Sequence, residues 1–128
     1  MPDYLSPAWM EAADRALAAD PALAEATRDV HLVLQQTVDE ADGAPPTSWH
    51  VRLEGGAARL VPGTAADATV TFTCDRQTAT EIHAGGSSAQ AAFMAGRLRV
   101  GGDVGALLAH QQLLAGLDDV LASLRTEA

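Results

Sequence analysis

A chain of 128 residues has the length of one ordinary domain, and its net charge of −9 argues against nucleic acid as a partner. Hydrophobic residues make up 48% of the chain and aromatic residues only 4%, so alanine, leucine and valine must build the core. The single cysteine, Cys74, excludes an internal disulfide and a cysteine-based zinc cluster. Without a signal-peptide pattern or a run of ~20 apolar residues, we expect one cytoplasmic domain over residues 1–128, with no stable membrane insertion.

The first half of the chain predicts one helix and three strands. Ser6 is placed to cap a helix over residues 6–19, and the Asp20-Pro21 step ends this helix. A short alanine-rich link follows. Alternating apolar residues then predict strands over residues 28–38, 49–54 and 57–61.

The second half predicts two more strands and several helices. The cleanest strand covers residues 68–74, where apolar residues alternate with threonines. Two short helices follow: the first ends at Gly85-Gly86, and the second starts at Ser87 and ends at Met94. A strand over residues 97–100 and a glycine turn lead to Asp103, which is placed to cap a long apolar-periodic region interrupted by Gly116.

This order of elements predicts an α+β domain with helices on one face of a sheet. The periodicity leaves open whether the last region is one kinked helix or two short ones. It also leaves open whether the inward apolar residues form a filled core or line a cavity, because both arrangements need apolar residues that face inward.

Two stretches resemble a known family. Residues 68–75 form an alternating strand that ends at an aspartate, and residues 92–103 follow the pattern Ala-Phe-x-x-Gly-Lys-x-x-Val/Ile-x-Gly-Asp. Phe93, Gly96, Val100, Gly102 and Asp103 fall on this pattern in register, with Arg97 at the position of the commoner lysine. In these features the chain resembles the sterol carrier protein type-two domain family, many of whose bacterial members stand alone.

The resemblance implies a five-stranded, mostly antiparallel sheet covered by helices, with a hydrophobic tunnel between sheet and helices. It also implies binding and intracellular carriage of an apolar ligand such as a fatty acyl chain or a sterol, without catalysis. The alternative is a scaffold or interaction subunit that has the same fold with a filled core, with a protein partner or as a homodimer.

The apolar candidates for lining such a cavity come from the second half of the chain. They are Phe72, Ile82, Phe93, Met94, Leu98, Val100, Leu107, Leu108, Leu114, Leu117 and Leu121. Within residues 91–108, Phe93, Leu98 and Leu107 are expected to face inward.

No sequence pattern predicts a catalytic residue, a metal ligand or a cofactor. The glycines near residue 100 flank a strand and do not have the spacing of a phosphate-binding loop. The four histidines form no metal-binding spacing. An enzyme is the least favoured function, and it would use His31 and His50, which lie on neighbouring predicted strands and could approach each other.

Overall fold

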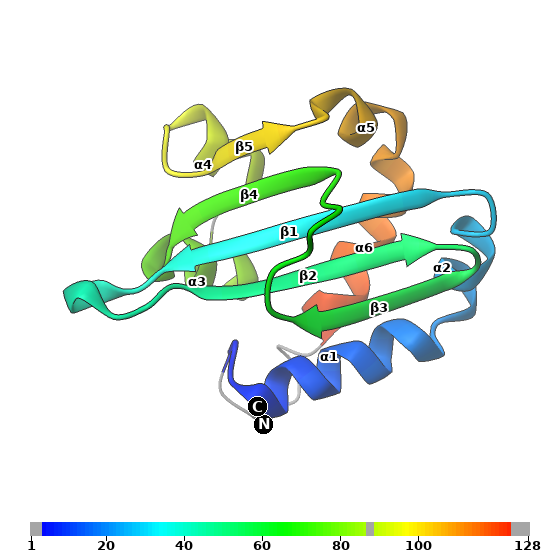
Figure 1. Ribbon diagram of the computed structural model, residues 1–128, viewed down its shortest axis with the longest axis horizontal. Helices are drawn as coiled ribbons and strands as arrows, with labels where there is room; N and C mark the ends of the chain where they lie inside the picture. The colour runs from blue at the N-terminus through cyan, green and yellow to red at the C-terminus, as the bar shows by residue number, and fades with distance from the viewer. Residues whose placement is uncertain (1–3, 87–88, 124–128) are drawn as a thin grey trace.

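The computed structural model describes residues 4–86 and 89–123 and shows one layer of helices against a five-stranded sheet (Figure 1). The elements follow in the order α1 (Pro7–Ala19), α2 (Pro21–Ala26), β1 (His31–Asp39), η1 (Ala41–Gly43), β2 (Thr47–Glu54), β3 (Ala57–Pro62), β4 (Val70–Asp75), α3 (Arg76–Ala84), α4 (Ala89–Met94), β5 (Arg99–Gly102), α5 (Val104–Ala109) and α6 (Gln111–Ser123).

The sheet has the strand order β3-β2-β1-β4-β5. All neighbouring strands are antiparallel except β1 and β4, which are parallel and pair Leu34 with Val70. Because parallel strands need a crossover, the chain passes from β3 to β4 across the face that lies opposite the helices (Figure 1). The crossover is fixed where the Thr69 hydroxyl accepts a hydrogen bond of 3.0 Å from the Val33 amide. The predicted α+β class and mostly antiparallel sheet are confirmed.

Helix α1 starts as predicted and protects the β3 edge of the sheet. The Ser6 hydroxyl accepts a hydrogen bond from the Trp9 amide, which satisfies one of the free donors of the first turn. On the same helix, Asp14 accepts hydrogen bonds from the Leu60 amide (2.9 Å) and the Arg59 side chain (2.8 Å). An edge strand with free amides would be open to pairing with another chain, and Asp14 closes this one.

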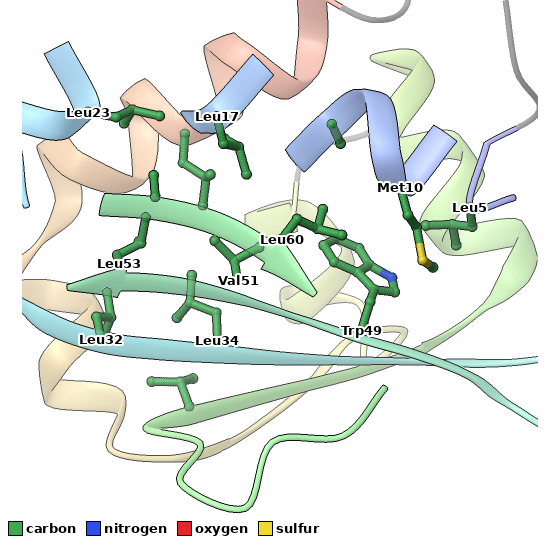
Figure 2. Packing of buried hydrophobic residues seen from close by; sticks show 14 of the residues in the cluster. Leu5, Met10, Leu17, Leu23, Leu32, Leu34, Trp49, Val51, Leu53 and Leu60 are labelled. Atoms are coloured by element: carbon green, nitrogen blue, oxygen red, sulfur yellow. The ribbon is translucent and has the colours of Figure 1, made fainter. Parts of the chain in front are cut away.

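The core lies between the sheet and the helices. Figure 2 shows Leu17 and Leu23 of the first two helices directed toward side chains of β1, β2 and β3, including Leu34, Val51 and Leu60. Alternation along the strands explains this packing, because every second side chain points to the helical face.

Two predictions for the first half need correction. The segment expected as an alanine-rich link is helix α2, which is capped by the Asp20 side chain through the amides of Ala22 and Leu23. Asp20-Pro21 therefore repeats the helix-start signal of Ser6-Pro7 besides ending α1. Strand β1 starts at His31 instead of residue 28, because α2 and its following turn occupy the preceding residues.

Strand β5 lies two residues later than predicted. Its last two residues are Gly101 and Gly102, which pair with Thr71 and Val70 in place of forming a separate turn. A Cβ atom on Gly102 would lie 2.5 Å from the Thr69 carbonyl oxygen, and one on Gly101 would lie 2.8 Å from the Thr71 hydroxyl oxygen. Only glycine allows β4 and β5 to come this close.

The C-terminal apolar region forms two helices, but the break lies at His110 and not at Gly116. Asp103 caps α5 as predicted, by accepting from the Ala106 amide. Gly116 lies within α6, where a Cβ atom would meet Leu23 at 3.6 Å. The predicted helix start at Ser87 lies outside the described residues.

Candidate functional site

The helical face of the sheet is buried unevenly. On β1 and β2, Leu34 and Val51 are only 2% and 1% exposed. At the start of β4, Val70 is also fully buried on this face, but Phe72 and Cys74 farther along β4 and Val100 of β5 are half-buried on the same face. The helices therefore cover the β1–β2 half of this face more tightly than the β4–β5 half.

Helices α5 and α6 contribute half-buried apolar side chains to the same part of the molecule. Helix α5 packs against both β4 and α6, so α5 covers this half of the sheet and α6 lies beside α5. We use the name half-buried layer for Phe72, Cys74 and Val100 of the sheet together with Leu107, Leu114 and Leu121 of the helices.

The structure brings only part of the predicted cavity lining into this layer. The predicted residues in the layer are Phe72, Val100, Leu107, Leu114 and Leu121. Leu98 and Leu117 are fully buried in the core, and Ile82 is half-buried on α3.

The expectation that Phe93 faces inward is wrong, and its neighbours in the predicted set, Met94 and Leu108, are exposed as well. The exposed fractions of Phe93, Met94 and Leu108 are 52%, 78% and 67%. Helix α4 has only six residues and lies at the outer edge, beyond β5 (Figure 1), where it turns Ala92 inward instead. The apolar pattern of so short a helix did not determine which side faces the core.

Gln36 is a residue of this region that the sequence interpretation missed. On the central strand β1 it pairs with Trp49 on one side and Phe72 on the other, so its side chain shares their face toward the helices. It is half-buried, and among the described residues its side-chain amide has no hydrogen-bond partner. A polar residue that interrupts an alternating apolar strand was the signal that could have found it.

An open groove of about 780 Å³ lies elsewhere, on the far side of α6 from the half-buried layer. None of the predicted lining residues contributes to it. It is lined by Ala16, Ala19, Asp20, Pro21, Ala22, Leu23, Ala26, Gln112, Leu113, Gly116, Asp119 and Val120. Its apolar floor, Leu23 and Leu113, is already buried in the core, so we consider the half-buried layer the better candidate for an apolar ligand.

Aromatic rings and ion pairs close one end of the core. Tyr4 stacks on His83 with ring centroids 4.2 Å apart, and Trp9 meets Trp49 edge to face at 6.1 Å. Both indole N–H groups are buried without an acceptor in the described part of the chain. Glu40 lies nearby and receives hydrogen bonds from the Arg76 guanidinium and the Thr47 hydroxyl.

The shifted pKa values keep these groups in their ordinary charge states at pH 7. Burial raises the pKa of the Tyr4 hydroxyl and of the Cys74 thiol, so both stay protonated. The hydrogen bonds from Arg76 and Thr47 lower the pKa of Glu40, so it stays ionised. The chemistry that these groups offer is packing and ion pairing.

The two histidines considered for catalysis do not meet. His31 lies opposite Glu54 and its Nδ1 is 2.6 Å from the carboxylate, whereas His50 lies opposite Gln35, four positions along the ladder. At about 3.3 Å per residue, this separates them by roughly 13 Å. His50 is buried below the β3–β4 crossover, where its Nδ1 lies 3.1 Å from the Gly63 carbonyl oxygen.

The profile of the SCP-2 sterol transfer family matches residues 13–115. The chain belongs to the SCP-2 sterol transfer family. A search among curated proteins gave no match. Membership means that the fold is that of a lipid-binding and lipid-transfer domain.

Solved structures of SCP-2 proteins agree with this assignment. A crystal structure of sterol carrier protein 2 is 25% identical, with a TM-score of 0.75 over 94% of this chain and 98% of that one. A conserved hypothetical protein from Thermus thermophilus is 25% identical, with a TM-score of 0.74 over 94% and 89% of the two chains. Palmitated SCP2L2 from Aedes aegypti is 26% identical, with a TM-score of 0.59 over 88% and 90%.

The residues that carry the SCP-2 resemblance mainly shape the β5 edge. Gly96 has a φ of 78° where α4 ends, Gly102 permits the close approach of β4, and Asp103 caps α5. Arg97, in place of the commoner lysine, forms an exposed ion pair with Glu81 at 2.9 Å. These positions hold α4, β5 and α5 in place beside the half-buried layer.

The helices of this SCP-2 domain in the described ranges are too short or too polar for a membrane span, which requires both length and apolar character. Within the same ranges, histidine, cysteine, aspartate and glutamate form no group of three or more that could hold a metal ion.

Proposed function

We propose that this protein binds an apolar lipid, such as a fatty acyl chain or a sterol, in the half-buried layer and carries it without changing it chemically. The observation that supports this most is the incomplete burial of Phe72 and Val100 on the helical face of the sheet. Apolar side chains that stay partly exposed on the helical face of the sheet can gain burial from an apolar ligand. The palmitated relative has the same fold.

We expect a ligand to reach the half-buried layer when a covering helix moves away from the sheet. Helix α5 has six residues, none of them fully buried, and it is separated from α6 by a break at His110. Elements with few buried apolar side chains open at low free-energy cost, so α5 is the part of the cover that we expect to move.

Native mass spectrometry and fluorescence titration test the proposal. We expect protein purified without added lipid to carry a bound lipid mass, or to take up a fluorescent fatty acid or a fluorescent sterol. Substitution Val100→Trp should fill the layer and weaken this uptake by about tenfold. The matched control is Val61→Trp, because Val61 lies at the opposite edge of the sheet and is 36% exposed. A clean apo mass with no uptake of either probe would contradict the proposal.

A scaffold or interaction subunit is the second candidate function. It is favoured by the exposed side chains of Phe93, Met94 and Leu108, since exposed large apolar residues often mark protein interfaces. Light scattering after gel filtration distinguishes it: a dimer that Phe93→Ser disrupts, in a protein that takes up no lipid, would favour the scaffold.

A further inference from the structure

Two neighbouring glutamines on β1 are treated differently by the fold. Gln35 points to the face of the crossover, where its Nε2 lies 3.2 Å from the Trp49 carbonyl oxygen and its Oε1 accepts from the Ala65 amide at 2.7 Å. Gln36 points to the helical face and makes no side-chain hydrogen bond among the described residues. Among the described residues, the side-chain amide of Gln35 therefore both donates and accepts hydrogen bonds, whereas that of Gln36 does neither.

Gln36 lies where a ligand in the half-buried layer would reach its side-chain amide. It lies between Trp49 and Phe72 on the central strand, in the same row of the sheet as Val100. Its half-buried state means that solvent reaches the amide at present. An apolar ligand over Phe72 and Val100 would displace that solvent, and an amide without a partner in apolar surroundings is costly. A ligand that places an oxygen beside the amide avoids this cost.

The charges of the molecule restrict what that oxygen can be. All seven arginines of the described residues are already paired with carboxylates, including Arg76 with Glu40 and Arg97 with Glu81. Arg99 pairs with Asp39 and, opposite Thr73, lies on the face away from the helices. Within the described residues, a ligand carboxylate beside Gln36 would thus lose its hydration without gaining an unpaired arginine, in a protein of net charge −9.

We propose that the ligand is a neutral lipid with a hydroxyl or carbonyl oxygen, and that Gln36 recognises this oxygen through its side-chain amide. The amide can donate to a carbonyl oxygen and can either donate to or accept from a hydroxyl. Gln36 is then a specificity-determining residue in a layer that is otherwise apolar. This inference rests on the proposed lipid carriage and adds the chemical class of the ligand.

The test uses ligands with the same sixteen-carbon chain and different head groups, each displacing a fluorescent sterol at pH 7.5: hexadecan-1-ol, methyl hexadecanoate, hexadecanoate and hexadecane. We expect the alcohol and the ester to bind at least about tenfold more tightly than hexadecanoate. Gln36→Met keeps the length of the side chain and removes its hydrogen bonds. It should weaken binding of the alcohol by about tenfold and leave hexadecane unchanged or tighter.

Control variants separate recognition from folding. Gln112→Leu changes an exposed glutamine in the open groove and should leave all four affinities unchanged. Gln36→Asn keeps an amide on a shorter side chain and should recover part of the preference for the alcohol. If Gln36→Met unfolds, this asparagine variant still tests the preference.

The outcomes distinguish this inference from the proposed function. Tighter binding of hexadecanoate than of hexadecan-1-ol, or equal binding of the alcohol by the wild type and Gln36→Met, would overturn the inference and leave lipid carriage standing. Failure of the sterol and all four ligands to bind would contradict both.

Discussion

The two halves of the helical face of the sheet differ in how they use similar residues. In the β1–β2 half, leucine and valine side chains such as Leu34 and Val51 are sealed under α1 and α6. In the β4–β5 half, Phe72, Val100 and Leu107 are equally apolar but remain half-buried. A fully buried apolar side chain contributes its whole hydrophobic free energy to folding. A half-buried side chain contributes only part of it, and the remainder can be gained when a ligand covers the exposed area. We therefore expect the β1–β2 half to supply most of the stability, and we propose the β4–β5 half as the place where a ligand binds.

The largest loss of stability should come from truncating a buried side chain in the β1–β2 half, which we call the sealed half. Leu53→Ala removes a side chain that is 0% exposed, so the free energy of unfolding should fall by about 3 kcal/mol. Leu107→Ala removes the same number of carbons from the half-buried layer, and the loss should stay below about 1.5 kcal/mol because that site already contacts solvent. Urea unfolding of both variants measures the difference, and equal losses would contradict the comparison.

The edge of the half-buried layer depends on the close approach of β4 and β5. Gly102→Ala should cost about 2–3 kcal/mol, because Gly102 has a φ of 82° and a Cβ atom would press against the Thr69 carbonyl. Gly63 is the matched control: its φ is 102°, but a Cβ atom would meet nothing within 4 Å. Gly63→Ala should therefore cost about 1 kcal/mol. The expected order would be wrong if thermal unfolding gave both variants the same melting temperature.

Asp14 of α1 accepts hydrogen bonds from Leu60 and Arg59 of β3, and these bonds predict that the free energy of unfolding depends on pH. The hydrogen bond from Arg59 lowers the pKa of Asp14 in the folded state, so folding favours the ionised carboxylate. This stability is complete above the unfolded pKa of about 3.9 and is lost as the pH falls through the lower folded pKa. Asp14→Asn should cost about 1 kcal/mol at pH 7 and less at pH 3, because the wild type loses the same interaction there.

Urea unfolding at pH 7, 4 and 3 checks this dependence. Glu11→Gln is the control, since Glu11 pairs with Arg15 on an exposed surface of the same helix and its loss should change stability very little. If the free energy of unfolding differed by the same amount between Asp14→Asn and the wild type from pH 7 to pH 3, the ionised Asp14 carboxylate would not be what stabilises this contact.

The smallest effect is expected within the sealed half itself. Trp49→Phe removes an indole N–H that is buried without an acceptor in the described part of the chain, which stabilises, and leaves a small gap, which destabilises. These opposing terms should leave the free energy of unfolding within about 1 kcal/mol of the wild type. A loss as large as that of Leu53→Ala would show that the indole N–H has a partner.

The fold was predictable because its signals are local and periodic. Alternation identified every strand, and Ser6 and Asp103 identified the helix starts that they cap. Helix α2 was missed because Asp20-Pro21 was interpreted only as a helix end. Strand β5 was placed two residues early because Gly101 and Gly102 have no alternating side chains, and their role depends on contact with β4.

The site was less predictable because burial is decided by tertiary packing. Phe72 and Phe93 are both apolar and both lie in matched stretches, yet one contributes to the half-buried layer and the other is exposed at the edge. Gln36 broke the alternation of β1, but only the register with Trp49 and Phe72 shows what its side chain faces. Sequence periodicity does not contain that register.

The most direct test of the central claim is a nuclear magnetic resonance titration of ¹⁵N-labelled protein with hexadecan-1-ol. If the β4–β5 half is the binding half, the amide shifts of Phe72, Val100 and Leu107 should move, while those of Val51 and Leu60 stay. Shifts confined to the open groove around Leu23 and Leu113, or equal shifts in both halves of the sheet, would contradict the account.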